Sequence, residues 1–113
     1  MRGRVVPLTD GEGGILGEAL LLNTFFRRLL GLSFRRETTG AVLLVPCNSI
    51  HTFFMRFPID AYFLSPDGEV LREVTGLVPG RVVPPVPGAR MVLEVPSGRG
   101  ETFRGRRRIV PRL

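Results

Sequence analysis

Glycine and proline interrupt this sequence so often that no long regular element fits between them. The 113 residues include 14 glycines and 10 prolines, yet 43% of the sequence is apolar. Both residues destabilise helix interiors, so a helical bundle is excluded, and the apolar content excludes a disordered chain. The length suits one hydrophobic core. We therefore predict a single domain over residues 1–113, built mainly from short strands, with an arginine-rich end over residues 99–113.

Several apolar runs have the length of strands and stop at turn-forming residues. They cover Ile15–Leu22, Ala41–Val45, Ala89–Val95 and, close to the end of the chain, Ile109–Val110. Ala41–Val45 is apolar throughout, which is typical of a strand covered on both faces, whereas the alternation in Ala89–Val95 predicts a strand covered on one face. A hairpin is predicted where Ile59–Leu64 and Glu69–Val74 flank the turn sequence Ser65–Gly68.

One helix and one proline-rich loop complete the predicted architecture. The stretch Phe25–Leu30 has apolar residues at helical spacing, and it follows a capping residue at Asn23 or Thr24 and precedes Gly31, which can end a helix. Four prolines within Gly76–Gly88 predict an extended surface loop. The predicted fold class is therefore α+β, mainly β, with an antiparallel barrel-like sheet of five to seven short strands and one packed helix.

The charged residues exclude several kinds of chemistry. All 16 basic residues are arginines, so Schiff-base catalysis, a lysine general base and a phosphate-binding loop lysine are excluded. One cysteine forbids an internal disulfide, and one histidine beside it cannot complete a zinc site of four Cys/His ligands within this chain. Six arginines against Glu101 give residues 99–113 a charge of +5 out of the total of +6. This end is interpreted either as a nucleic-acid contact or as a solvated strand end.

No stretch of this sequence is expected to span a membrane. The longest apolar run, Ile15–Leu22, is interrupted by Gly17 and Glu18, and the apolar residues after Met1–Arg4 are too few for a secretory signal. A lone thiol is compatible with a reducing compartment. We therefore expect a cytoplasmic protein without a membrane span.

The only cysteine and the only histidine lie in one polar segment, Pro46–Asp60, which reads Pro-Cys-Asn-Ser-Ile-His-Thr-Phe-Phe-Met-Arg-Phe-Pro-Ile-Asp. Together with Arg-Leu-Leu-Gly-Leu at 28–32 and Val-Leu-Glu-Val-Pro-Ser-Gly at 92–98, this segment resembles the family named domain of unknown function 192, or uncharacterised protein family 0127. The Ile-His-Thr sequence resembles a narrower subset of that family, to which Cys47 and His51 belong.

The resemblance implies a small, mainly β fold with one helix and no established activity, cofactor or substrate. It places the motif residues of the family at Gly31, Leu32, Met55, Asp60, Leu93, Glu94 and Gly98. Many members carry an N-terminal export or membrane segment, which this sequence is expected to lack. Members usually have an aspartate after the last glycine, whereas Arg106 follows Gly105 here.

Cys47, His51 and Met55 permit two chemical hypotheses besides core packing. Their side chains are soft metal ligands, so a Cu(I) site is one hypothesis, and a Cys47/His51 nucleophile pair is another. Four residues of extended chain separate Cys47 from His51 by up to roughly 13 Å, so the pair needs a turn. A buried thiol, a histidine bonded to a backbone carbonyl and a core methionine are the favoured interpretations, and no cofactor is expected.

Asp60 and Glu94 are carboxylates on strands that are otherwise apolar. For Asp60 we favour a structural ion pair with Arg56 or Arg28, or bonds from backbone N–H groups. The alternative is that both carboxylates face one another and hold a water or a hard cation. Whether the two meet is left open by the sequence.

The function favoured by the sequence is a small soluble binding or accessory domain for an anionic or polyol ligand, rather than an enzyme. Hydrogen-bonding side chains crowd an irregular segment beside a rigid sheet, where recognition sites are common. The candidate surface combines the loop 76–88 with Asn48, Ser49, His51 and Arg56, and Asp60 and Glu94 are further candidates. Nucleic-acid association through the arginine-rich end, a Cys/His-dependent enzyme and a soft-metal site remain as alternatives.

Overall fold

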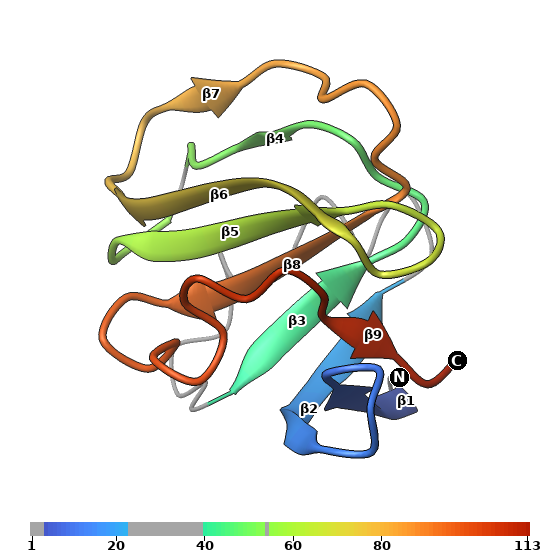
Figure 1. Ribbon diagram of the computed structural model, residues 1–113. Coiled ribbons are helices and arrows are strands. Elements are labelled where there is room, and N and C mark those ends of the chain that lie inside the picture. The colour runs from blue at the N-terminus through green and yellow to red at the C-terminus, as the bar shows by residue number, and fades with distance from the viewer. Residues whose placement is uncertain (1–3, 23–39, 54) are drawn as a thin grey trace.

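The computed structural model describes residues 4–22, 40–53 and 55–113, and these residues form nine strands and no helix. The strands are β1 Arg4–Thr9, β2 Ile15–Leu22, β3 Ala41–Leu44, β4 Ile50–His51, β5 Ile59–Leu64, β6 Val70–Leu77, β7 Val82–Val83, β8 Met91–Pro96 and β9 Val110–Pro111. Seven of them form one sheet in the order β6-β5-β8-β3-β2-β1-β9, and β4 pairs with β7 in a small second sheet (Figure 1). The fold is therefore mainly β, and the predicted helix at Phe25–Leu30 lies outside the described residues.

The expectation of an antiparallel sheet is wrong at one strand pair. Strands β2 and β3 run parallel, with Ala19 opposite Ala41 and Leu22 opposite Leu44, while the other paired strands are antiparallel. A parallel pair needs a connection of a dozen residues or more, and the segment between β2 and β3 is long enough to provide it.

Local sequence patterns located most of the strands correctly. Strand β2 has the predicted bounds, and the hairpin of β5 and β6 is confirmed, with the Gly68 amide donating to Ser65 O at 2.9 Å. Gly68 has a φ of +85°, and a Cβ there would lie 2.7 Å from Ile109 O, so this turn requires glycine. The loop predicted for 76–88 is shorter than expected, since β6 extends to Leu77 and Val82–Val83 pairs with β4.

One strand differs from its prediction, and another was not predicted. Strand β8 was expected to be half covered, but all six of its residues are buried because it lies between β5 and β3 in the middle of the sheet. Strand β1 was not predicted, since Pro7 interrupts its apolar run and lacks an N–H donor. Its neighbour β9 pairs only with Leu8 and Thr9, so Pro7 is tolerated near the edge of the sheet.

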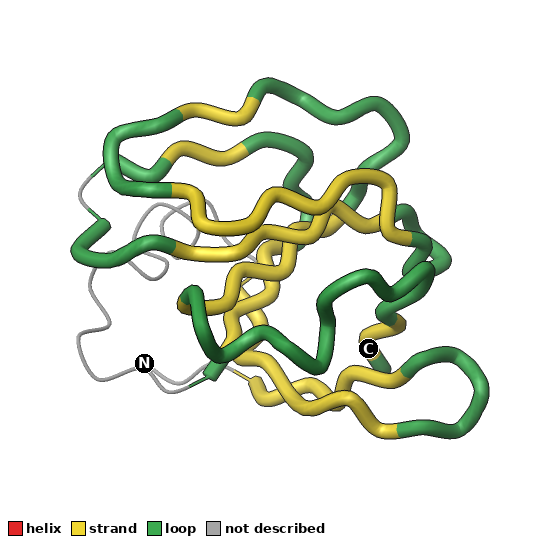
Figure 2. Tube along the Cα trace, turned by 60° about the vertical axis from the view of Figure 1, so that its left-hand side comes forward, coloured by secondary structure: helices red, strands yellow, loops and turns green. Residues whose placement is uncertain are grey.

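The arginine-rich end joins the two edges of the sheet, whose curled shape is visible in Figure 2. On the β6 side, the Val70 amide donates to Arg107 O at 2.9 Å and the Ile109 amide donates to Gly68 O at 2.8 Å. On the other side, β9 pairs with β1. Ile109 is completely buried, so this end is a folded part of the domain.

Two hydrophobic clusters lie on opposite faces of the sheet. Tyr62, Leu64 and Leu93 belong to the first cluster, whereas Ala61 and Phe63 belong to the second. This division follows the alternation of side chains along each strand. Each fully buried large side chain contributes roughly 1.5 to 3 kcal/mol, so both clusters stabilise the fold. The described residues include no helix that could cross a membrane.

Candidate functional site

The first part of the predicted polar segment borders a surface pocket of about 270 Å³. Its lining residues are Pro46, Cys47, Asn48, Ser49, Ala89 and Arg90. Backbone bonds hold its walls together, because the Cys47 amide donates to Arg90 O and the Val86 amide donates to Asn48 O, each at 2.9 Å. We call this cavity the Arg90 pocket. Asn48 and Ser49, two of the site residues proposed from the sequence, both line it. Arg90 lines it as well, and the sequence prediction missed this residue.

The Arg90 pocket has a distinctive set of functional groups. Asn48 supplies an amide, Ser49 a hydroxyl and Arg90 a guanidinium, and no carboxylate is among its described lining residues. The Cys47 thiol donates to Ser49 O at 3.1 Å. The pocket therefore offers hydrogen-bond donors and one positive charge.

His51 and Arg56 do not line the Arg90 pocket. His51 lies on β4 opposite Val82, and its ring stacks on Phe53 with 5.1 Å between ring centroids. Its Nδ1 atom is buried and has no hydrogen-bond partner among the described residues. Arg56 is exposed. The residues of the candidate surface predicted from the sequence therefore do not all line one pocket.

The soft-metal hypothesis gains little support from the structure. Met55 is 9% exposed and packs in the second hydrophobic cluster, as its core interpretation expects. Within the part of the chain that the structure describes, no three His, Cys, Asp or Glu side chains are grouped closely enough to hold a metal ion.

Thr52 is a completely buried polar residue that the sequence prediction missed. Its hydroxyl donates to Val78 O at 2.8 Å and accepts from the Arg81 amide at 2.7 Å, while its carbonyl accepts from the Gly80 amide at 3.0 Å. These bonds hold the turn between β6 and β7 against β4. No local signal could identify Thr52, because its partners lie more than twenty residues further along the chain.

Replacement of Thr52 by valine should destabilise the protein by about 2 kcal/mol, since it leaves the Arg81 amide without its acceptor and removes the bond to Val78 O. Urea unfolding followed by circular dichroism measures this effect. The exposed Thr75 provides the control, and Thr75→Val should change stability by less than about 0.5 kcal/mol. Equal effects of the two substitutions would contradict the role given to Thr52.

Asp60 is held by neutral partners and a distant arginine. The carboxylate is 1% exposed, and its Oδ1 accepts from the Gly76 amide at 2.8 Å and from the Ser97 hydroxyl at 2.9 Å. Arg104 Nη2 lies 3.8 Å from Oδ2. The structural interpretation is therefore supported, with Arg104 in place of Arg56, while Arg28 lies outside the described residues.

Asp60 and Glu94 do not share a site. In the register between β5 and β8, Asp60 faces Val95 and Ala61 faces Glu94. Paired residues point to the same side of a sheet and successive residues to opposite sides, so the two carboxylates lie on opposite faces. The hypothesis of one water or cation between them is wrong. Burial raises the pKa of Glu94 to about 8.

Asp60 and Tyr62 point to the same face of β5, under the loop that carries Phe103 and Arg104. Burial, followed by the nearby charges of Glu73 and Asp60, raises the pKa of Tyr62 to about 12. The phenol therefore keeps its proton at neutral pH. Its oxygen has no hydrogen-bond partner among the described residues.

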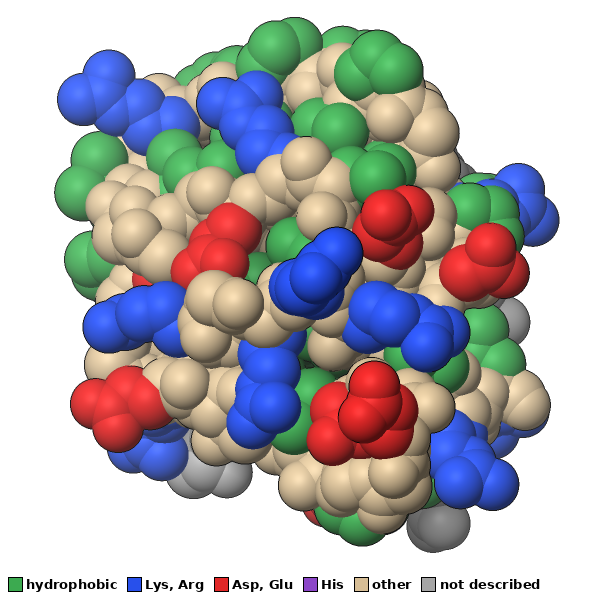
Figure 3. All heavy atoms as spheres, in the orientation of Figure 1, with side chains coloured by type: hydrophobic (Ala, Val, Ile, Leu, Met, Phe, Trp, Pro, Cys, Tyr) green, Lys and Arg blue, Asp and Glu red, His purple; other side chains and the backbone are tan. Residues whose placement is uncertain are grey.

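The arginines of the C-terminal end are interspersed with carboxylates. Figure 3 shows blue and red side chains alternating over one face of the molecule, with no continuous basic surface. Arg106, Arg107 and Arg108 line a cavity that also contains four carboxylates. Since carboxylates repel phosphates, this arrangement does not favour the nucleic-acid hypothesis.

Comparison with known proteins identifies relatives of most of this chain. The sequence pattern of DUF192, described as an uncharacterized ACR, matches residues 9–104. A UPF0127 protein of Pyrococcus horikoshii is 36% identical over 93 residues, which are 78% of this chain and 80% of that protein. A UPF0127 protein of Pyrococcus furiosus is 34% identical over 86 residues, covering 72% of this chain and 73% of the relative.

The fold also occurs in a crystal structure of a protein of unknown function from Novosphingobium aromaticivorans. The TM-score is 0.73 at 20% identity, and the match covers 96% of this chain and 84% of that one. This similarity shows the fold alone. Membership of the narrower Ile-His-Thr subset stays a prediction. The match over residues 9–104 and the identity to the two Pyrococcus proteins show that this chain belongs to the DUF192 family, also named UPF0127, whose function is uncharacterised.

Proposed function

We propose that this protein is a small binding domain for an anionic ligand, and that the ligand occupies the Arg90 pocket. The observation that carries the proposal is that Asn48, Ser49 and Arg90 line one cavity whose described walls hold no carboxylate. A guanidinium donates in pairs to carboxylate or phosphate oxygens. Asn48 and Ser49 can supply further donors to such an oxyanion.

The backbone around the pocket favours binding because it is already ordered. The Arg90 amide donates to Leu64 O at 2.7 Å, and the Ala89 amide donates to Val86 O at 3.1 Å. Arg90 therefore starts from a fixed main chain, and only its side chain must become ordered when a ligand binds. The substitution Arg90→Gln keeps these backbone bonds, so it tests the charge without disturbing the fold.

Titration of the isotope-labelled protein with phosphate, sulfate and citrate, followed by NMR, should give saturable shifts at Asn48 and Ser49 for at least one of these anions. Arg90→Gln should weaken that binding at least tenfold, because a bond to a charged group contributes roughly 1.5 to 3 kcal/mol. The matched control is Arg99→Gln, since Arg99 is exposed and outside the pocket. Equal losses in both variants would indicate general charge attraction and contradict the proposal.

Neutral myo-inositol tests whether the ligand is a polyol. Binding of this probe with the same affinity in the wild type and in Arg90→Gln would place a polyol, and not an anion, in the pocket. The Cys/His-dependent enzyme is not supported by a shared site, because Cys47 lines the Arg90 pocket and His51 does not.

A further inference from the structure

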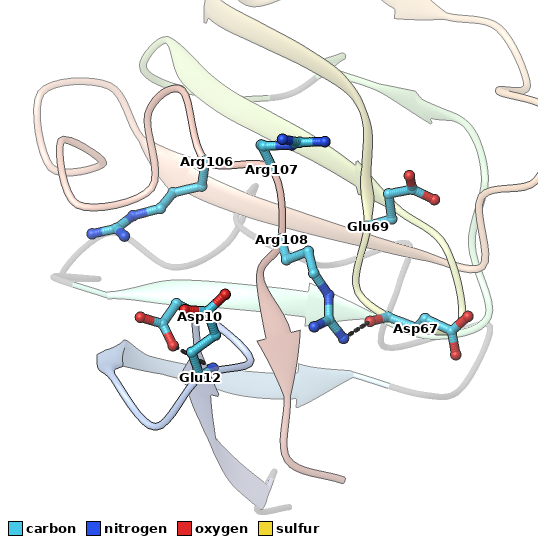
Figure 4. Close-up of a pocket in the computed structure, with 7 residues that line it drawn as sticks. All are labelled: Asp10, Glu12, Asp67, Glu69, Arg106, Arg107 and Arg108. Carbon is cyan, nitrogen blue, oxygen red and sulfur yellow. Dashed lines mark hydrogen bonds between the residues drawn. The ribbon is translucent and has the colours of Figure 1, made fainter.

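A second cavity, with a volume of about 690 Å³, lies where three distant segments of the chain meet (Figure 4). The turn between β1 and β2 contributes Asp10 and Glu12, and the hairpin turn contributes Asp67 and Glu69. The segment Arg106–Arg108, which precedes β9, runs between these two acidic turns in Figure 4. We call this cavity the mixed-charge cavity, and none of its residues lines the Arg90 pocket.

The backbone of the arginine segment that lines the cavity is hydrogen-bonded to β6. Arg107 O accepts from the Val70 amide at 2.9 Å, Glu69 forms a β-bridge with Arg108, and the next residue, Ile109, is buried. The same backbone bonds close the sheet. A site on such a segment is held in place by the fold and not by a loose tail.

The opposite charges of the cavity are not paired with one another. Among the described residues, no guanidinium of this cavity lies within ion-pair distance, 4.0 Å, of one of its carboxylates. Arg108 Nη2 instead donates to the backbone oxygen of Asp67 at 3.1 Å, and Arg106 Nε donates to Thr102 O at 2.9 Å. Both arginines thus donate to backbone oxygens and not to a carboxylate of the cavity, although the charge of Arg106 also acts on Asp10.

The acidic side of the cavity shows the same pattern. Asp10 Oδ1 accepts from the Glu12 amide at 2.7 Å and from the Gly14 amide at 3.0 Å. These bonds, with a smaller contribution from the charge of Arg106, lower the pKa of Asp10, so its carboxylate is charged at neutral pH. The cavity therefore presents negative and positive groups on separate segments of the chain.

We propose that the mixed-charge cavity binds a small zwitterion that carries both an ammonium and a carboxylate, such as a short peptide with free ends. A simple anion would face four carboxylates and a simple cation would face three guanidiniums, so each meets repulsion. A zwitterion places its carboxylate toward the arginines and its ammonium toward an acidic turn. The volume lies in the range of small-ligand pockets.

The dipeptide Ala-Ala is a suitable probe, because its two ends can be blocked separately. NMR titration of the full-length protein at low salt should give saturable shifts of the Gly68 and Arg108 amides. The N-acetylated dipeptide and the C-terminal amide should each bind at least tenfold more weakly. Equal binding of the free and blocked dipeptides, or no binding of the free dipeptide, would overturn the proposal.

Variants separate the cavity from the general charge of the protein. Arg107→Gln and Glu69→Gln should each weaken dipeptide binding at least tenfold, while the backbone bonds that close the sheet are retained. The controls Arg99→Gln and Glu101→Gln make the same charge changes at exposed residues outside the cavity and should leave binding unchanged. Arg90→Gln should also have no effect, so this test is independent of the Arg90 pocket. Equal losses in the controls, or salt-sensitive DNA binding abolished by Arg107→Gln, would contradict a zwitterion site.

Discussion

Replacement of Glu94 by glutamine is expected to stabilise the protein at pH 8 and to leave it nearly unchanged at pH 4.5. Glu94 is 3% exposed, and burial raises its pKa from 4.5 to about 8. Between these two values the folded state keeps a proton that the unfolded chain releases. The free energy of unfolding therefore falls as pH rises, by about 1.4 kcal/mol per pH unit for this group. Above pH 8 the folded state also ionises and the decline ends.

Glutamine has nearly the same shape and does not titrate, so the difference in unfolding free energy between Glu94→Gln and the wild type should increase from pH 4.5 to pH 8. Denaturant unfolding at several pH values measures this difference, in which the titration of the other groups cancels. Glu101 is exposed and serves as the control, and Glu101→Gln should show no such trend. A difference that is independent of pH would mean that Glu94 is not protonated in the folded state.

Substitution of Asp60 by alanine is expected to destabilise the protein by about 3 kcal/mol, because two hydrogen bonds to a buried carboxylate are lost. The sequence favoured an ion pair with Arg56 or Arg28, or bonds from backbone N–H groups, and the structure supplies one such backbone bond, from Gly76. The Arg104 side chain is 53% exposed, so it returns to water when Asp60 is removed. The cost lies instead in the Gly76 amide and the Ser97 hydroxyl, which lose their acceptor.

Thermal and urea unfolding of Asp60→Ala and Asp60→Asn measure this cost and separate charge from hydrogen bonding. Asparagine keeps an acceptor oxygen, so it should be less destabilising than alanine. Arg104→Ala should reduce stability by less than about 1 kcal/mol, since it removes only a long, exposed ion pair. A loss of stability in Arg104→Ala as large as that in Asp60→Ala would mean that the ion pair, and not the hydrogen bonds, accounts for the stabilising effect of Asp60.

The strands and the hairpin could be predicted because their signals are local. Ile15–Leu22 is a strand with the predicted bounds, and the turn Ser65–Gly68 contains the proline and glycine that such turns need. Burial of the strands was harder to predict. Ala89–Val95 alternates like a half-covered strand, yet β8 is buried throughout, because its place between β5 and β3 is a property of the whole sheet.

The candidate sites were predicted only in part, since their residues come from distant positions. Asn48 and Ser49 were identified from their polarity, but Arg90 joins them only because Cys47 pairs with it across more than forty residues of sequence. Similarly, the sequence of the arginine-rich end does not show that two acidic turns from earlier parts of the chain lie beside it in the structure.

The sequence by itself determined that the fold is mainly β, and it also determined the hairpin, the family and the absence of lysine chemistry, because each of these depends on composition or on neighbouring residues. The tertiary structure decided that Asp60 and Glu94 lie on opposite faces and that the C-terminal arginines face carboxylates. Strand register and sheet closure set both results. Both depend on pairing between segments that lie far apart in the chain. Local sequence patterns do not specify this pairing, because it is determined by the free energy of the whole core.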